Sequence, residues 1–172
     1  ICQLAGWVFA PVLVERRGLF RAVEAFAGGG ALSRQLNLGG ILTFSYDIKQ
    51  HAVLQNILTP SGFSFLISLC LRLDVLGLAW FGIVCSNWVW IGRRNTGRSE
   101  ATPMGNPEYR KVREANQMVS RMVVLLWILE ALGLLWFFEQ PVSSTMILHV
   151  RLQEFLLLML QRSIRVVRAL VN

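Results

Sequence analysis

The sequence predicts an α/β protein with a doubly wound, mostly parallel sheet. Short apolar runs alternate with helical segments along the chain, and this alternation is typical of strand–helix–strand units. The runs are apolar throughout and do not alternate between apolar and polar residues, which indicates strands that are covered on both faces. The chain has 172 residues, of which 54% are hydrophobic, so it is long enough to bury the core of about one domain.

The expected strands and helices begin at residue 21. Strands are predicted at RAVEAF (21–26), ILTFSY (41–46), LGLAWFGIV (76–84) and LLWFF (134–138). Helices are predicted at 31–38, 49–58, 60–73, 112–132 and 143–170. Glycine and proline mark most of the breaks between them, and the polar stretch 93–113 is expected to be a loop.

We divide the chain into three parts. Residues 1–20 form an N-terminal segment without a clear period, residues 21–144 form the core, and residues 145–172 form a C-terminal helix with a basic face. That face consists of arginines spaced by three, Arg162, Arg165 and Arg168. It could contact phosphate or a membrane, or simply be solvated. Because the chain starts with Ile1 instead of Met, we expect a processed product or a fragment.

The charge and the cysteines restrict the class of site. The formal net charge is +7, and arginine accounts for nearly all of the positive charge. Arginine suits phosphate and carboxylate partners, although a solvated basic surface is an equally good explanation. Three cysteines and two histidines without a CxxC motif predict neither a disulfide framework nor a metal site. They favour a reducing, intracellular location.

Distinctive residues stand where the first two predicted strands end. In a parallel sheet, ligands bind beyond the carboxyl ends of the strands. The first strand runs into a glycine turn at 28–30, which allows close approach of a ligand to the backbone. The second ends at Asp47, whose carboxylate could accept hydrogen bonds from ribose. Together, the glycine turn and Asp47 suit the binding of NAD or S-adenosylmethionine. The alternatives are an ordinary tight turn and an aspartate at the N-terminus of a helix.

The other two strands end at a cysteine and a glutamate. Cys85 could be a nucleophile if cations favour its thiolate, and Arg93, Arg94 and Arg98 follow it in the chain. Glu139 could act as a proton donor. The local sequence around Cys85 is more typical of a buried core cysteine, and a capping carboxylate is the alternative role of Glu139.

Taken in order, these sites resemble the motifs of the cytosine-C5 DNA methyltransferase family. FAGGGA (26–31) is similar to the family's FAGxGG motif, and Asp47 falls on its cofactor-ribose acid. GIVCS (82–86) keeps the glycine and cysteine of the G-P-P-C-Q nucleophile motif but neither proline nor the glutamine. EQP (139–141) keeps the acid of the E-N-V motif. The resemblance covers about residues 21–144, and Asn56 stands where the family has an aspartate.

The resemblance implies a fold, a cofactor and a reaction. The fold is the Rossmann-like, mostly parallel type of the S-adenosylmethionine-dependent methyltransferases, with the C-terminal part of the domain missing. The implied cofactor is S-adenosylmethionine, held by Phe26, Gly28, Gly30, Asp47 and Asn56. In the implied reaction Cys85 attacks C6 of a flipped cytosine while Glu139 supports N3 of the base.

The resemblance also implies a nucleic-acid partner. DNA, or RNA in its place, would lie against the loop 92–107, whose arginines Arg93, Arg94 and Arg98 would contact phosphates. A solvated insertion is the alternative for this loop. The implied location is nuclear or organellar.

Parts of the family pattern are missing. No QxRxR motif follows Glu139, and the chain ends before a target-recognition region could fit. We therefore expect a chain that is catalytically inactive alone or a fragment.

Three other functions are compatible with parts of the sequence. One is a non-enzymatic scaffold on the same fold, and another is a small polytopic membrane protein with spans at 63–84 and 122–138, where charges and glycines oppose that interpretation. A nicotinamide enzyme is less favoured, because Ser33 stands where the dinucleotide fingerprint has glycine.

Overall fold

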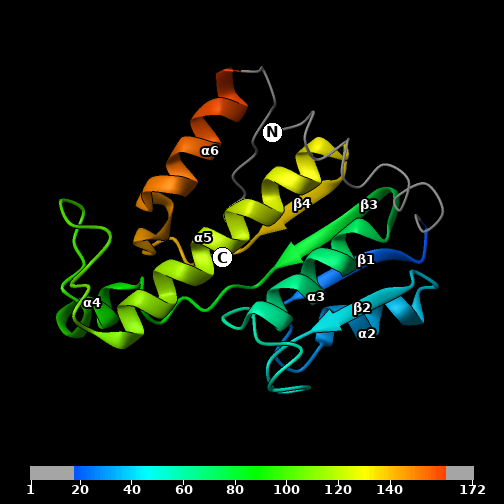
Figure 1. Ribbon diagram of the computed structural model, residues 1–172, viewed down its shortest axis with the longest axis horizontal. Coiled ribbons are helices and arrows are strands. Elements are labelled where there is room, and N and C mark those ends of the chain that lie inside the picture. Colours follow the sequence, from blue (N-terminus) through cyan, green and yellow to red (C-terminus); the bar gives the residue numbers. More distant parts are fainter. Residues whose placement is uncertain (1–17, 162–172) are drawn as a thin grey trace. The chain divides into compact units, whose positions relative to one another are not determined.

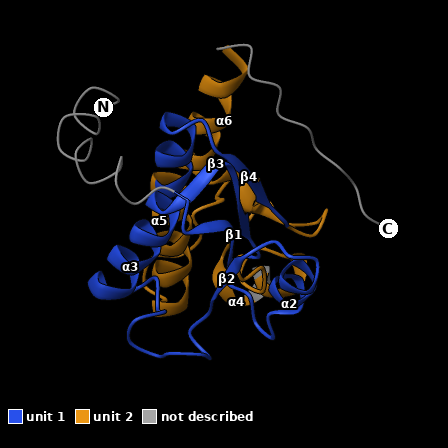
Figure 2. Ribbon diagram, turned by 90° about the vertical axis from the view of Figure 1, so that its right-hand side faces the viewer, with its two compact units in different colours: residues 1–82, 125–139 blue, residues 83–124, 140–172 orange. Residues whose placement is uncertain are grey.

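The computed structural model describes residues 18–161, except for the side chains of Arg93 and Arg94. The elements follow in the order β1 (Phe20–Ala25), α2 (Ala31–Leu38), β2 (Thr43–Tyr46), α3 (Pro60–Leu71), β3 (Leu73–Phe81), α4 (Trp90–Thr96), α5 (Arg110–Ala131), β4 (Leu135–Phe138), the 3₁₀ turn η1 (Thr145–Leu148) and α6 (Val150–Gln161) (Figure 1). They divide into two compact units (Figure 2). Unit 1 contains residues 1–82 and 125–139, and unit 2 contains residues 83–124 and 140–172.

The sheet lies in unit 1 and has the order β2-β1-β3-β4. Every neighbouring pair is parallel. The predicted α/β class with a parallel sheet is therefore confirmed, and the architecture is compatible with a Rossmann-like fold. The predicted core, 21–144, contributes to both units.

Helices α2 and α3 cover opposite faces of the sheet (Figure 2). The alternation of side chains along the strands explains which residues face which helix. Glu24 of β1 bonds to Ser33 in α2, whereas Tyr46, which pairs with Ala25 in the neighbouring strand, donates its hydroxyl proton to the Gly62 carbonyl in α3. Both faces of β1 are thus covered, and its residues from Ala22 to Ala25 are all buried. This is the burial that a continuous apolar strand predicts.

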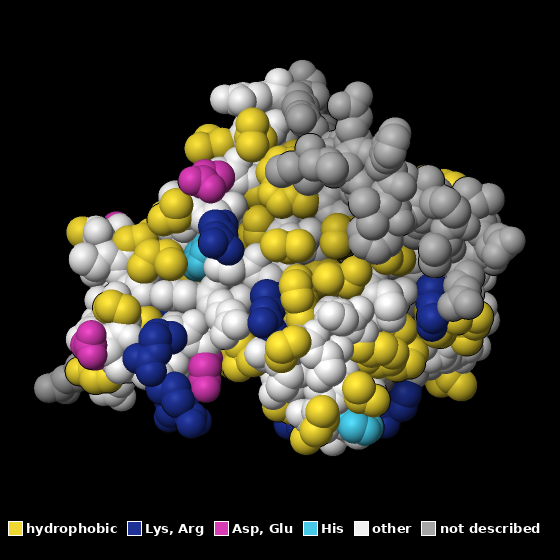
Figure 3. Space-filling model, viewed as in Figure 1, with side chains coloured by type: hydrophobic (Ala, Val, Ile, Leu, Met, Phe, Trp, Pro, Cys, Tyr) yellow, Lys and Arg dark blue, Asp and Glu magenta, His cyan; other side chains and the backbone are white. Residues whose placement is uncertain are grey.

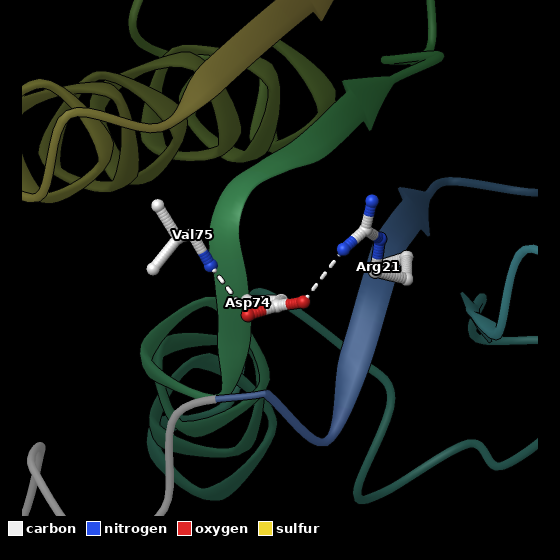
Figure 4. A network of polar contacts seen from close by, with 3 residues as sticks. All are labelled: Arg21, Asp74 and Val75. Atoms are coloured by element: carbon white, nitrogen blue, oxygen red, sulfur yellow. Dashed lines mark hydrogen bonds and ion pairs between the residues drawn. The ribbon is translucent and has the colours of Figure 1, made fainter.

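Strand β3 bulges near its start. Phe20 of β1 pairs with Leu73 and Ala22 pairs with Leu78, so β3 advances five residues where β1 advances two. The extra residues include Asp74, whose carboxylate accepts a hydrogen bond from the Arg21 guanidinium at 2.7 Å (Figure 4). The guanidinium lowers the pKa of this carboxyl below its usual value. The ion pair joins the bulge to the neighbouring strand.

Unit 2 contains α4, the first part of α5, the turn η1 and α6. Buried positions in the first part of α5 recur at helical spacing, at Val112, Ala115, Val119 and Met122. Helix α6 repeats the pattern with Leu152, Phe155 and Met159. In this unit the Thr145 backbone and hydroxyl both donate to the Trp88 carbonyl, at 2.9 and 3.0 Å.

Four predicted elements differ from the structure. The strand expected at 76–84 instead spans Leu73–Phe81, so Cys85 does not directly follow it. The helix expected at 49–58 is wrong, since these residues form successive turns that side chains of Asp47, His51 and Asn56 stabilise. The stretch expected as a loop from residue 93 includes most of α4. The long last helix is divided, because His149 has an extended conformation between η1 and α6.

Two other expectations concern the ends of the chain and the membrane. The basic face formed by Arg162, Arg165 and Arg168 lies outside the described residues, as does most of the segment 1–20. Between residues 18 and 161, none of the helices combines the length and the apolarity that crossing a membrane requires.

Candidate functional site

Asp47 organises the carboxyl edge of the sheet in unit 1. It directly follows β2 and is only 8% exposed. Its Oδ2 atom accepts the backbone N–H of Gly28 at 2.8 Å, and Oδ1 accepts that of Lys49 at 2.8 Å. Its own N–H donates to the Gln55 side chain. The carboxylate therefore connects the end of β2 to the glycine turn after β1, as the shared edge of two parallel strands predicts.

The turn after β1 has a strained backbone. Phe26 has a φ of 61°, a left-handed conformation that costs a non-glycine residue about 1–3 kcal/mol. Gly28 and Gly30 have φ values of 57° and 64°, which glycine adopts without that cost. Gly30 immediately precedes α2. The predicted glycine turn thus forms a tight connection between β1 and α2 at the carboxyl edge of the sheet.

Glu24 is a site residue that the sequence analysis missed. It lies in β1, is 8% exposed, and its Oε2 accepts both the backbone N–H and the hydroxyl of Ser33, at 2.7 and 2.5 Å. Glu24 thereby accepts a hydrogen bond from one of the backbone N–H groups that have no acceptor within the first turn of α2. An acid at a position that the strand pattern predicts to be buried was the available signal, because a buried carboxylate requires a partner.

A cavity of about 260 Å³ opens beside these residues, within unit 1. It is lined by Glu24, Phe26, Ala27, Ala31, Leu32, Trp80, Gly82 and Glu139. Ligand pockets usually measure about 300–1,000 Å³, so this cavity can enclose part of a cofactor-sized molecule. The lining combines apolar and aromatic side chains with two carboxylates. Of the predicted cofactor residues, Phe26 lines it directly, while Gly28, Gly30 and Asp47 shape the adjoining turn.

Glu139 lies at the rim of this cavity and is exposed. It follows β4, and its backbone N–H donates to the Phe81 carbonyl at 3.1 Å. A Cβ atom at Gly82 would lie 3.8 Å from Glu139 Oε1 and 3.3 Å from the Phe26 carbonyl oxygen. The predicted acid therefore lies beside the predicted cofactor turn, and Gly82 leaves the space between them open.

Asn56 does not line the cavity. Its side-chain oxygen accepts the N–H of Leu58, and its carbonyl accepts the N–H and hydroxyl of Thr59. These bonds form the turn that leads into α3. In this structure Asn56 stabilises a loop, and nothing in its contacts assigns it to the cavity.

Cys85 belongs to unit 2 and is half-buried. It follows β3 after a short extended stretch, and its carbonyl accepts the N–H groups of Trp88 and Val89. Glu139, by comparison, belongs to unit 1. Cys70, by contrast, is fully buried in unit 1, and burial raises the pKa of its thiol to about 12.

Arg98 does not have the exposed position that phosphate binding requires. It is 3% exposed, and its guanidinium lies 3.5 Å from the centroid of the Trp88 ring. It donates hydrogen bonds to the carbonyls of Pro103 and Val112 and to the Asn116 side chain. Its expected contact with nucleic acid is therefore corrected: Arg98 anchors the loop of unit 2 to α5. Arg93 and Arg94 lie in α4.

On the face seen in Figure 3, lysine and arginine side chains occur at several separate places among exposed hydrophobic ones. The exposed arginines of unit 2 include Arg110 and Arg113 at the start of α5. Arg110 forms an ion pair with Glu114, at 3.2 Å.

His149 lies in the core of unit 2 next to the same tryptophan. It is 1% exposed, its ring centroid is 5.9 Å from that of Trp88, and neither ring nitrogen forms a well-aligned hydrogen bond. Burial lowers the pKa of His149 to about 4, the backbone of Asn116 partly offsets the shift, and the charges of Arg98 and Arg151 add to it. Among the described residues, no group of three His, Cys, Asp or Glu side chains could hold a metal ion.

Comparison with models of protein families, with curated proteins and with solved structures found no match for this chain.

Proposed function

We propose that unit 1 binds S-adenosylmethionine and that the chain is a cytosine-C5 DNA methyltransferase-like domain. The observation that carries the proposal is the cavity beside the turn after β1, bounded by Phe26 and Ala27 on one strand end and by Gly82 and Glu139 on two others. Parallel sheets bind adenosine-containing cofactors at this edge. The motif order Phe26, Asp47, Cys85, Glu139 supports the methyltransferase type of the fold.

The residues present fit such a cofactor. Phe26, Leu32 and Trp80 offer apolar surface for the adenosyl and methionine carbons. Asp47 holds the glycine turn in place and retains a free lone pair on each oxygen, so it can accept a ribose hydroxyl in addition. When bound, S-adenosylmethionine supplies an electrophilic methyl group.

The catalytic part of the proposal concerns Cys85 and Glu139. Cys85 Sγ would attack C6 of a cytosine that is flipped out of the helix, and Glu139 would hold N3 by a hydrogen bond. The exposure of Glu139 at the cavity rim and the partial exposure of Cys85 support these roles. DNA is the proposed macromolecular partner, with Arg93 and Arg94 as the proposed phosphate contacts.

A non-enzymatic scaffold is the second candidate. It is favoured by the contacts of Asp47, because both of its carboxylate oxygens already accept backbone hydrogen bonds. On this alternative Asp47 would serve only to hold two strand ends together.

Calorimetric titration of the full chain with S-adenosylmethionine separates the two candidates. Ala31→Phe is the test variant, because Ala31 lines the cavity and has an exposed side chain that can be enlarged without filling the core. Ala101→Phe is the control, at an exposed position of unit 2. We expect saturable binding by the native chain and by Ala101→Phe, and at least about tenfold weaker binding by Ala31→Phe. A folded native chain that does not bind contradicts the proposal and leaves the scaffold.

A further inference from the structure

We infer that the cavity selects a positively charged organic ligand, an onium ion, and rejects nucleotides that present a phosphate to it. The inference rests on the proposed function and names the charge that the same site accepts. It depends on the side chains that line the cavity, on the contacts of Glu24, and on the way in which α2 begins.

The charges that line the cavity are all negative. Glu24 and Glu139 contribute two carboxylates, and no lysine, arginine or histidine is among the lining residues. Glu24 is buried whereas Glu139 is exposed, so the charge of Glu24 is screened less by water than that of Glu139. The chain as a whole carries +7, so this negative cavity is opposite in sign to the protein around it.

Glu24 has a binding position left for a ligand. Ser33 occupies its Oε2 atom through two hydrogen bonds, whereas Oε1 accepts none from the described residues. The residue is 8% exposed and lines the cavity. Its Oε1 atom is not among the fully buried side-chain atoms that lack a partner, so it is accessible from the cavity, and a cationic group there could pair with it.

The start of α2 is unsuited to phosphate. Free N–H groups at a helix N-terminus commonly bind the pyrophosphate of dinucleotides. Here the Glu24 carboxylate accepts one of them, that of Ser33, at 2.7 Å. A phosphate would have to displace the Glu24 carboxylate or lie beside it. In the second case the two negative charges would repel each other. The contact therefore disfavours nicotinamide and flavin dinucleotides.

Aromatic side chains complete the cation site. Phe26 and Trp80 both line the cavity, and the faces of aromatic rings attract onium ions. The Trp80 ring is held by stacking on Phe137, with centroids 5.7 Å apart and an interplanar angle of 18°. The sulfonium of S-adenosylmethionine belongs to this class of cation, while the thioether of S-adenosylhomocysteine is neutral. The two compounds therefore form a matched pair of probes.

The test compares binding of the two compounds and of NAD to the full chain by calorimetry. We expect S-adenosylmethionine to bind about tenfold more tightly than S-adenosylhomocysteine, and NAD not to bind. In Glu24→Gln the preference should fall to within about twofold, mainly by loss of affinity for the sulfonium. Ser33→Ala is the matched control, because it removes a hydrogen bond to Glu24 but keeps the charge, and its preference should persist.

Glu139→Gln provides a second variant in case Glu24→Gln does not fold, and it should also reduce the preference. Equal affinities for the two adenosyl compounds in the native chain overturn the inference and leave the proposed function intact. A preference that survives in both glutamine variants overturns it as well. Absence of binding by every probe overturns the proposed function and the inference together.

Discussion

The Asp47 carboxylate accepts the backbone N–H of Gly28 at 2.8 Å, across nineteen residues of sequence. The bond joins the end of β2 to the turn that follows β1, and it holds the wall of the cavity. Asp47 therefore has a structural function whether or not a ribose hydroxyl also binds to it. Loss of ligand binding on its removal would combine two effects, which is why the binding test uses Ala31 instead.

The structural function of Asp47 predicts a loss of stability. Asp47→Ala leaves the N–H groups of Gly28 and Lys49 without their acceptor, and we expect the free energy of unfolding to fall by about 1–3 kcal/mol. Urea denaturation followed by circular dichroism measures the change. Glu100→Gln, at an exposed carboxylate of unit 2, is the control. An unchanged unfolding midpoint for Asp47→Ala would show that the bond contributes nothing.

His149 predicts a pH dependence of stability. Its pKa in the folded chain is lowered from 6.5 to about 4, so the unfolded chain takes up the proton first as the pH falls. The free energy of unfolding should therefore decrease between about pH 6.5 and pH 4, by about 3 kcal/mol in total. Denaturation at several pH values measures this slope.

Two variants identify the source of that slope. His149→Phe removes the titrating group and should flatten the curve between pH 6.5 and 4, relative to the native chain. Ala101→Ser changes an exposed position of unit 2 without adding or removing a titrating group and should leave the curve as it is. If the native chain and His149→Phe lose stability in parallel, the buried ring is not the cause.

The cysteines should differ in reactivity. Cys70 is fully buried with a pKa of about 12, so its thiolate is scarce at neutral pH, whereas Cys85 is partly exposed. In a Cys2→Ser background, iodoacetamide should label Cys85 in the folded chain and both cysteines in urea. Mass spectrometry of the digested protein measures each site. Labelling of Cys70 at the same rate as Cys85 would contradict the burial that the structure shows.

Gly62 in α3 should tolerate no side chain. A Cβ atom there would lie 2.0 Å from the Asn56 carbonyl oxygen, so Gly62→Ala should destabilise the protein by more than about 2 kcal/mol. Gly29→Ala is the matched control, because a Cβ at Gly29 would meet nothing within 4 Å. Thermal unfolding compares the two. Equal midpoints would mean that the loop before α3 moves aside without cost.

Most helices and strands were predicted from short sequence patterns, because glycines, capping residues and hydrophobic periodicity act over only a few residues. Helix α2 has the bounds that its flanking glycines predict, and α3 begins at Pro60 after a Thr59 cap, as its sequence indicates. The helix expected at 49–58 was wrong for a local reason too. Side chains of Asp47, His51 and Asn56 bond to nearby backbone groups and compete with helix formation.

The sequence by itself determined the parallel α/β class and the positions of Asp47 and Glu139 directly after strands, whereas Cys85 lies four residues beyond the end of β3 at Phe81. Hydrophobic runs and turn residues specify these features over short distances. Only the tertiary structure decided which groups meet: Glu24 with Ser33, Arg98 with Trp88, and Asp47 with Gly28. Such contacts depend on burial and on the order of strands in the sheet. For that reason Arg98, which the sequence places in a polar loop, is enclosed, while Glu24, which the sequence places in an apolar strand, lines the cavity.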